Sequence, residues 1–238
     1  MTSSPPSAAR YESGTDRLLV EVSGPVATVT FNNPGKHNAL SADMRAALPG
    51  ALRALNADGD IRVIIMTGAG DKAFTAGADI SEFGEQRTSP AARASYDQAW
   101  AAANDAWASL DKPVIAMIRG FCMGGGLVTA LQADIRIASD DSQFGIPAAR
   151  LGLGYGVSGV TALMNLIGPA RTAEVLFSAR RFPAAEALQM GLVNRVVPAG
   201  GLREAVLSLA DSIAGNAPLN KPATSTVRHR ICTSSHGC

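Results

Sequence analysis

The chain has 238 residues, of which 47% are hydrophobic and 17% are charged. This composition excludes a disordered polypeptide, and the length suffices for one domain with a substantial core. The formal net charge is +1, without a large basic block, and no apolar run reaches the roughly 20 residues that a membrane-spanning helix needs. We therefore expect a tightly packed globular protein that binds neither nucleic acid nor a membrane.

The N-terminal segment and the cysteines bear on the cellular compartment. Residues 1–16 are rich in Ser, Pro and Ala and lack an apolar signal core, so they predict a flexible leader. Three cysteines, Cys122, Cys232 and Cys238, form neither a disulfide framework nor a metal quartet, and we expect no metal site. Cys122 lies in an apolar stretch, which indicates a small core residue in a reducing cytoplasm.

The first half of the chain alternates β-branched runs with helical patterns. In order, it predicts strands at 18–22 and 26–31, a helix after Ser41, a buried strand at 62–67 and a helix at 89–110. Pro49 and Gly50 lie inside the first of these helices. An interior proline costs about 3 kcal/mol, so we expect a kink or a restart there.

The second half continues the alternation. It predicts a strand at 113–118, a helix from 124 to about 132, a strand at 134–138, and helices at 170–177, 184–190 and 202–214. Buried strands that alternate with helices indicate the α/β class, without choosing among α/β folds.

Two glycine-rich segments follow buried strands, at residues 74–80 and at Gly124-Gly125-Gly126. Glycines at the end of a strand present unpaired N–H groups, which suit a phosphate or a developing oxyanion. Close packing of a helix on a strand explains a glycine triplet alone equally well. Because the two segments together supply two donors for one oxygen, the pair favours an oxyanion hole.

Four parts of the sequence resemble the enoyl-CoA hydratase/isomerase (crotonase) superfamily. They are residues 34–40, 72–80, 120–126 with 144–147, and 181–193, and the resemblance extends over roughly 18–218. It implies an α/β fold in which ββα units form a superhelix, the ClpP/crotonase fold, with a C-terminal helical trimerisation region. On this basis we expect, after the leader, a superhelical core at 17–190, a C-terminal helical region at 191–218 and an irregular tail at 219–238.

The resemblance also implies a substrate, a site and an assembly. The substrate is an acyl-CoA, with no permanently bound cofactor, and the protein forms a homotrimer or a dimer of trimers. Backbone N–H groups of Ala76 and Gly125 are expected to stabilise a thioester enolate. The coenzyme is expected to lie along Lys36, His37, Ala39, Ala76, Ala78, Asp79 and Ile80.

The sequence departs from the family where proton transfer is expected. Hydratases of the family use two glutamates, and the corresponding positions here are Val128 and Ala148, neither of which transfers a proton. Tyr155 follows in a glycine-rich loop and is a candidate catalytic hydroxyl, with a packed tyrosine as the alternative. Three further charged residues have possible roles in the site, but a structural or solvated role is favoured for each: Glu82, Glu85 and Arg150.

The C-terminal tail is also shorter than the long helix that the family usually carries, which puts closure of the pocket in question. We expect an acyl-CoA enzyme that stabilises an enolate, and whose hydration chemistry is non-standard or weak. The alternative is a non-catalytic acyl-CoA-binding homologue. Turnover of a substrate distinguishes the two.

Overall fold

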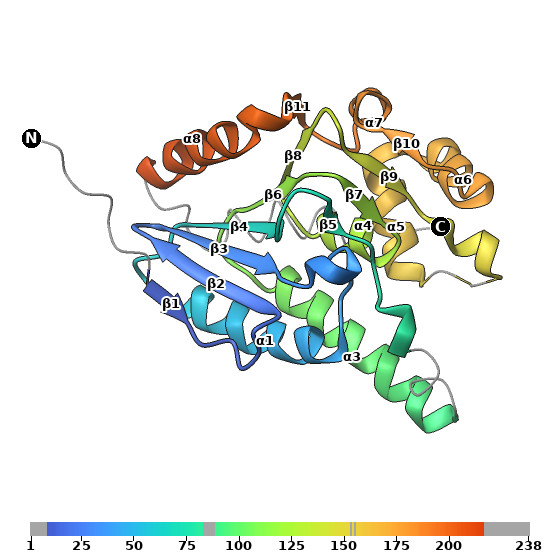
Figure 1. Cartoon of the computed structure of the whole chain (residues 1–238), viewed down its shortest axis with the longest axis horizontal. Coiled ribbons are helices and arrows are strands. Elements are labelled where there is room, and N and C mark those ends of the chain that lie inside the picture. The colour runs from blue at the N-terminus through green and yellow to red at the C-terminus, as the bar shows by residue number, and fades with distance from the viewer. Residues whose placement is uncertain (1–8, 83–88, 153, 155, 217–238) are drawn as a thin grey trace, which may run out of the picture.

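The structure is a computed structural model that describes residues 9–82, 89–152, 154 and 156–216. These residues form a mixed α/β fold with a large sheet, a smaller sheet and helices on both faces of the large sheet (Figure 1). The predicted α/β class is confirmed.

The large sheet has seven strands. In spatial order they are β1 (Ala9–Tyr11), β2 (Leu18–Ser23), β3 (Val26–Phe31), β4 (Val63–Gly68), β6 (Val114–Ile118), β8 (Ile135–Ser139) and β11 (Arg195–Val197). The pairs β1–β2 and β2–β3 are antiparallel, and all pairs from β3 to β11 are parallel. The long strands of this sheet are the ones that the β-branched runs predicted.

The small sheet has four short strands. In spatial order they are β10 (Phe182–Pro183), β9 (Gln143–Gly145), β7 (Phe121–Met123) and β5 (Ala73–Thr75). None of them was predicted, because two or three residues are too few to show an alternating pattern. This sheet matters for function because β5 and β7 lead directly into the two glycine-rich segments.

Seven α-helices lie in the described part of the chain. They are α1 (Ala42–Ala57), α3 (Pro90–Ala108), α4 (Gly125–Ala130), α5 (Val157–Ile167), α6 (Pro169–Ser178), α7 (Ala184–Met190) and α8 (Leu202–Gly215). Short 3₁₀ turns occur at Pro34–Lys36, Ile80–Glu82, Pro147–Leu151 and Ala199–Gly201. Helix α5 was not predicted.

Helix α1 continues through Pro49 as a single element, so the structure shows no restart there. Leu48, Leu52 and Leu55 of this helix are buried in the core. Burial of a leucine side chain contributes about 1.5–3 kcal/mol, so three of them outweigh the local cost of the proline.

The core lies on both faces of the large sheet, and β4 shows why. Ile64 and Met66 belong to the main hydrophobic cluster with residues of α1 and α3, whereas Val63 and Ile65 pack with residues of α8. Successive side chains of a strand point to opposite faces, so a continuous apolar run is the pattern of a strand covered on both sides. Figure 1 shows α8 above the sheet and α1 and α3 below it.

The N-terminal segment differs from the sequence-based expectation. Residues 9–11, predicted as part of a flexible leader, form β1 and pair antiparallel with β2. The hydroxyl of Tyr11 also donates a hydrogen bond to Asp58 at the end of α1. Backbone pairing and this side-chain contact place the strand at the edge of the large sheet.

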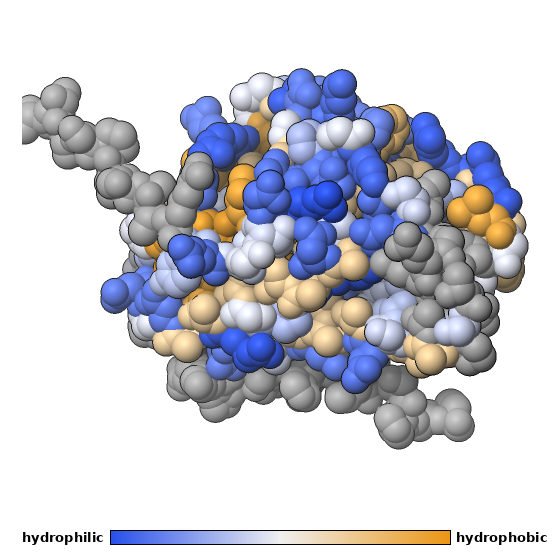
Figure 2. All heavy atoms as spheres, turned by 60° about the horizontal axis from the view of Figure 1, so that its bottom comes forward, coloured by the Kyte–Doolittle hydropathy of each residue, from blue (hydrophilic) through white to orange (hydrophobic). Residues whose placement is uncertain are grey.

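Two further sequence-based expectations concern burial and surface. Cys122 is fully buried as predicted, and burial raises the pKa of its thiol well above the ordinary value. Within the described ranges, no helix is both long and apolar enough to cross a membrane. Figure 2 shows that the face turned forward from the bottom of Figure 1 mixes hydrophilic residues with weakly hydrophobic ones.

Candidate functional site

The two glycine-rich segments meet at Gly77, which lies just after β5. Its φ is +98°, a conformation that favours glycine. A Cβ atom at this position would lie 2.9 Å from the Met123 carbonyl oxygen and 3.0 Å from the Gly125 backbone nitrogen. A side chain would therefore collide with the backbone of the second segment, and glycine permits the close approach.

The backbone around Gly77 is fixed by Leu40. The Leu40 N–H donates to the Gly77 carbonyl at 2.7 Å, and the Asp79 N–H donates to the Leu40 carbonyl at 3.3 Å. Leu40 and Ala78 thus form an isolated parallel bridge. This pairing uses the groups on either side of the Ala78 N–H and leaves that N–H without a hydrogen-bond partner among the described residues.

Gly125 supplies a second open N–H. It is the first residue of α4, where a backbone N–H has no partner within the helix, and no described residue accepts from it. The Ala78 nitrogen lies 3.6 Å from the point where a Cβ of Gly125 would stand. Two unpaired donors from different segments are therefore close together.

The structure contradicts the prediction that the Ala76 N–H is the first donor. This N–H donates to the His37 carbonyl at 2.9 Å and is not available to a ligand. Ala78, two residues later, has the free N–H. The sequence placed Ala78 among the coenzyme contacts but did not show that its N–H is open, because the hydrogen bonds that decide between the two residues come from residues 37–40.

The predicted coenzyme loop adopts a tight conformation beside this segment. His37 and Asn38 both have positive φ values, 51° and 54°. The buried Asn38 side chain holds the turn together by donating to the Ala69 and Ala73 carbonyls at 2.9 and 2.7 Å. Ala39 is buried behind it. Because the His37 carbonyl accepts from Ala76, the loop lies directly beside the end of β5.

Lys36 and Asp79 connect the coenzyme loop to the first glycine segment. The Lys36 ammonium lies 2.8 Å from an Asp79 carboxylate oxygen and 2.7 Å from the Ser81 hydroxyl. Burial alone would raise the pKa of the Asp79 carboxyl, but hydrogen bonds from Lys36 and Ser81 outweigh it and hold the pKa below its ordinary value of 3.8. Asp79 is therefore an ionised anchor, and half of the Lys36 side chain stays exposed to solvent. Ile80 follows at the start of a 3₁₀ turn.

The residues expected near the reacting carbons are apolar. Val128 is buried on α4, one turn after Gly125, and Ala148 is half-buried in the turn at Pro147–Leu151. Arg150 is exposed in the same turn. Tyr155 and Glu85 lie outside the described residues.

Glu82 has a structural role rather than the solvated one that the sequence favoured. Its carboxylate accepts from the Ala42 N–H at the start of α1, at 3.0 Å, and lies 3.6 Å from the Arg45 guanidinium. A carboxylate at a helix N-terminus stabilises the helix. These contacts compensate the negative charge of the Glu82 carboxylate.

The sequence assigned no role to Trp100, which lies within the helix predicted at 89–110. Trp100 lies on α3, and its Cη2 atom would be 2.9 Å from a Cβ of Gly125. The indole therefore stands beside the two open N–H groups. No local pattern marks this residue, because the contact joins positions 25 residues apart in sequence.

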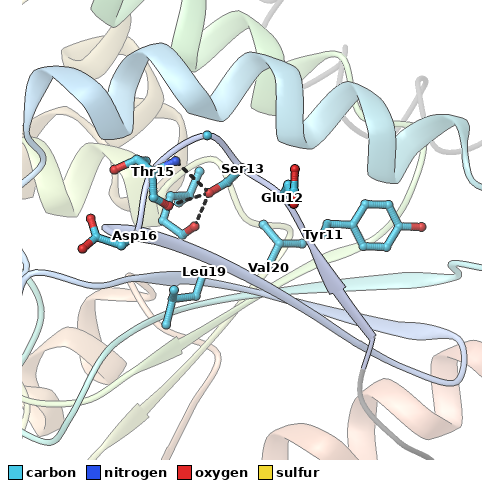
Figure 3. Close-up of a pocket in the computed structure, with 9 residues that line it drawn as sticks. Tyr11, Glu12, Ser13, Thr15, Asp16, Leu19 and Val20 are labelled. Carbon is cyan, nitrogen blue, oxygen red and sulfur yellow. Dashed lines mark hydrogen bonds between the residues drawn. The ribbon is translucent and has the colours of Figure 1, made fainter.

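A separate hollow lies on the connection between β1 and β2 (Figure 3). Its lining residues run from Tyr11 to Val20, and the Ser13 hydroxyl within it donates to the Thr15 and Leu18 carbonyls. None of the candidate site residues lines it. Within the described part of the chain there is also no cluster of three or more His, Cys, Asp or Glu residues of the kind that holds a metal ion.

Comparison with known proteins identifies the family. The sequence profile described as enoyl-CoA hydratase/isomerase matches residues 21–232. The chain belongs to the enoyl-CoA hydratase/isomerase family. Its relatives are enzymes, so the chain is identified as an enzyme of this family. It is 37% identical over 207 residues to a short-chain-enoyl-CoA hydratase of Clostridium acetobutylicum, and the match covers 86% of this chain and 77% of the relative. It is also 36% identical over 204 residues to a carnitinyl-CoA dehydratase of Salmonella typhi, with the same coverage.

Solved structures of the family confirm the crotonase fold. An enoyl-CoA hydratase/carnithine racemase from Magnetospirillum magneticum superposes with a TM-score of 0.87 at 35% identity, covering 91% of this chain and 81% of the other. A putative enoyl-CoA hydratase/isomerase family protein from Hyphomonas neptunium gives 0.86 at 36% identity, covering 95% and 86%. The family resemblance and the fold class inferred from sequence are thus both correct.

Proposed function

We propose that this family member binds an acyl-CoA and stabilises the enolate of its thioester with the N–H groups of Ala78 and Gly125. The observation that carries the proposal is the convergence of these two unpaired donors at Gly77. Charge that develops on the thioester oxygen would meet donors that are already in place, and one such donor is worth about 10²–10³ in rate. By their names, the relatives from Clostridium and Salmonella act on CoA thioesters.

In this proposal the coenzyme lies along the turn at 36–39 and the segment at 76–80. Half of the Lys36 side chain is exposed, so its ammonium can contact a phosphate of the coenzyme while it stays paired with Asp79. Contact with the backbone of residues 76–78 would bring the thioester to the two donors. A homotrimer or a dimer of trimers remains part of the proposal.

The chemistry proposed is enolate stabilisation without the family's usual pair of glutamates. Val128 and Ala148 carry no group that can activate water or protonate a carbon. Decarboxylation, retro-aldol cleavage and isomerisation of an unusual acyl group depend mainly on a stabilised enolate, so they fit best. The same two residues favour one alternative, a homologue that binds acyl-CoA without turning it over.

The test measures crotonyl-CoA hydration by loss of enoyl absorbance, and acetoacetyl-CoA binding by calorimetry. We expect binding, with hydration well below the usual enzyme range of about 1–10³ s⁻¹. The Gly77→Ala variant, whose new methyl group would crowd the Gly125 nitrogen, should bind at least about tenfold more weakly.

The matched control is Gly50→Ala, since a Cβ at exposed Gly50 meets nothing within 4 Å, and this variant should bind like the wild type. Absence of binding to the wild type would overturn the proposed function. Hydration in the usual range would show that another residue transfers the proton.

A further inference from the structure

The Trp100 indole lies beside the two donor N–H groups. A Cβ at Gly125 would lie 2.9 Å from the indole Cη2 atom, 3.5 Å from Cζ2 and 3.6 Å from the Ala78 nitrogen. The edge of the six-membered ring and the Ala78 N–H therefore both lie within van der Waals range of one point. An oxygen held by both donors would be next to this edge.

The indole is held in place by Arg45. The guanidinium carbon lies 5.3 Å from the centre of the Trp100 ring and 5.0 Å from that of Tyr96, and the two rings meet edge to face at 6.3 Å. A cation over an aromatic ring is attracted to it, the more so when the cation is desolvated. Arg45 is 3% exposed, so movement of the indole would uncover a buried charge.

Arg45 ties this wall to the donors through Leu40. The Arg45 Nη1 group donates to the Leu40 carbonyl at 2.5 Å, and the same carbonyl accepts from the Asp79 N–H. Leu40 thus fixes both the segment that carries the Ala78 N–H and the arginine that holds Trp100. The Leu40 carbonyl therefore contacts both the donor segment and the arginine beside Trp100.

Two other features describe the surroundings of the donors on this side. The Trp100 Nε1 atom is buried and has no hydrogen-bond partner in the described part of the chain, so the indole adds no polar contact there. Val128, one helical turn from Gly125, adds an apolar side chain on the same face of α4. The surroundings of the donors are therefore closed and apolar on this side.

We propose that Trp100 determines specificity by ending the acyl pocket, so that the site takes short acyl groups and excludes long chains. This inference rests on the proposed function, because it assumes that a thioester binds at Ala78 and Gly125. The coenzyme lies on the side of His37, and the acyl group must extend towards the indole. In this proposal a chain of four carbons ends beside the ring edge, and a longer chain requires the indole to move.

The test compares binding of butyryl-CoA, decanoyl-CoA and free CoA by calorimetry, since saturated thioesters bind without reacting. Each buried methylene is worth about fourfold in affinity where a pocket accepts it. We expect the wild type to gain nothing from the six extra carbons of decanoyl-CoA. The Trp100→Ala variant should bind decanoyl-CoA at least about tenfold more tightly relative to butyryl-CoA, and Trp100→Phe should fall between.

The control is Trp107→Phe, a change to the other tryptophan of α3, which is buried in the core away from the donors. It should lower stability and leave the ratio of the two affinities unchanged. Circular dichroism establishes whether each variant is folded. If Trp100→Ala does not fold, the comparison is made with Trp100→Phe instead.

Each outcome decides a different point. Butyryl-CoA binding with an unchanged ratio in both Trp100 variants would overturn the role of Trp100 and leave the proposed function intact. Tighter binding of decanoyl-CoA than of butyryl-CoA to the wild type would also overturn the role of Trp100 and leave the proposed function intact. Failure of the wild type to bind any CoA thioester would overturn the proposed function, and with it this inference.

Discussion

The carboxylate of Asp79 is 3% exposed and keeps its charge through Lys36 and Ser81. Because its folded-state pKa is lowered, it contributes stability that is complete above the ordinary value of 3.8 and is lost as the pH falls through the lowered value. Asp79→Asn should therefore lower the free energy of unfolding by about 1–3 kcal/mol at pH 7. Urea denaturation between pH 7 and pH 3 measures the difference.

The difference between wild type and Asp79→Asn should stay constant from neutral pH towards 3.8 and shrink below it. Asp97→Asn, at an exposed position on α3, is the control and should change stability little at any pH. A difference that grows on acidification would contradict an ionised, hydrogen-bonded Asp79.

The same residue scale shows why the sequence identified both glycine-rich segments but chose an N–H group, that of Ala76, which is already hydrogen-bonded. Glycine spacing identified both segments, since close backbone approach requires residues without side chains. Which N–H of residues 76–78 is free depends on hydrogen bonds from His37 and Leu40, about 40 residues earlier. A local pattern carries no information about such partners.

At the scale of elements, length decided what could be predicted. Runs of five or six residues rich in β-branched side chains identified β3, β4 and β6, because burial on both faces leaves a continuous apolar signature. The strands of the small sheet have two or three residues and exist through pairing with distant segments. Local sequence is silent on such pairing, so this sheet was missed.

Replacement of glycine by alanine should have opposite effects on stability at two positions, although neither position is crowded. A Cβ meets nothing within 4 Å at Gly50 in α1 or at Gly24 in the β2–β3 turn, but only Gly24 has a positive φ, +55°. Gly50→Ala should raise the free energy of unfolding by about 0.5–1 kcal/mol, because alanine loses less entropy in a helix. Gly24→Ala should lower it by about 1–2 kcal/mol.

Urea denaturation of both variants against the wild type checks this pair. Equal effects at the two positions would mean that backbone conformation does not decide the outcome. Because Gly50 and Gly24 both lie outside the candidate site, the variants also provide proteins of raised and lowered stability with an unaltered site.

At the scale of the whole molecule, the candidate site exists only in the folded state. It joins Leu40, Gly77 and Gly125, which lie in different parts of the sequence and meet through the two sheets. A ligand that binds there has no site in the unfolded chain, so it stabilises the fold by mass action. At about 100 times its dissociation constant, the gain is about 2.7 kcal/mol.

Acetoacetyl-CoA at that concentration should therefore raise the melting temperature of the wild type by about 5–10 °C. Gly24→Ala should melt lower and show the same increase, because its site is unaltered, whereas Gly77→Ala should lose most of the increase. Free CoA lacks the thioester oxygen and should give a smaller shift than acetoacetyl-CoA. Equal shifts in the wild type and in Gly77→Ala would place the ligand away from the Ala78 and Gly125 donors, because only binding at those donors depends on the absence of a side chain at Gly77.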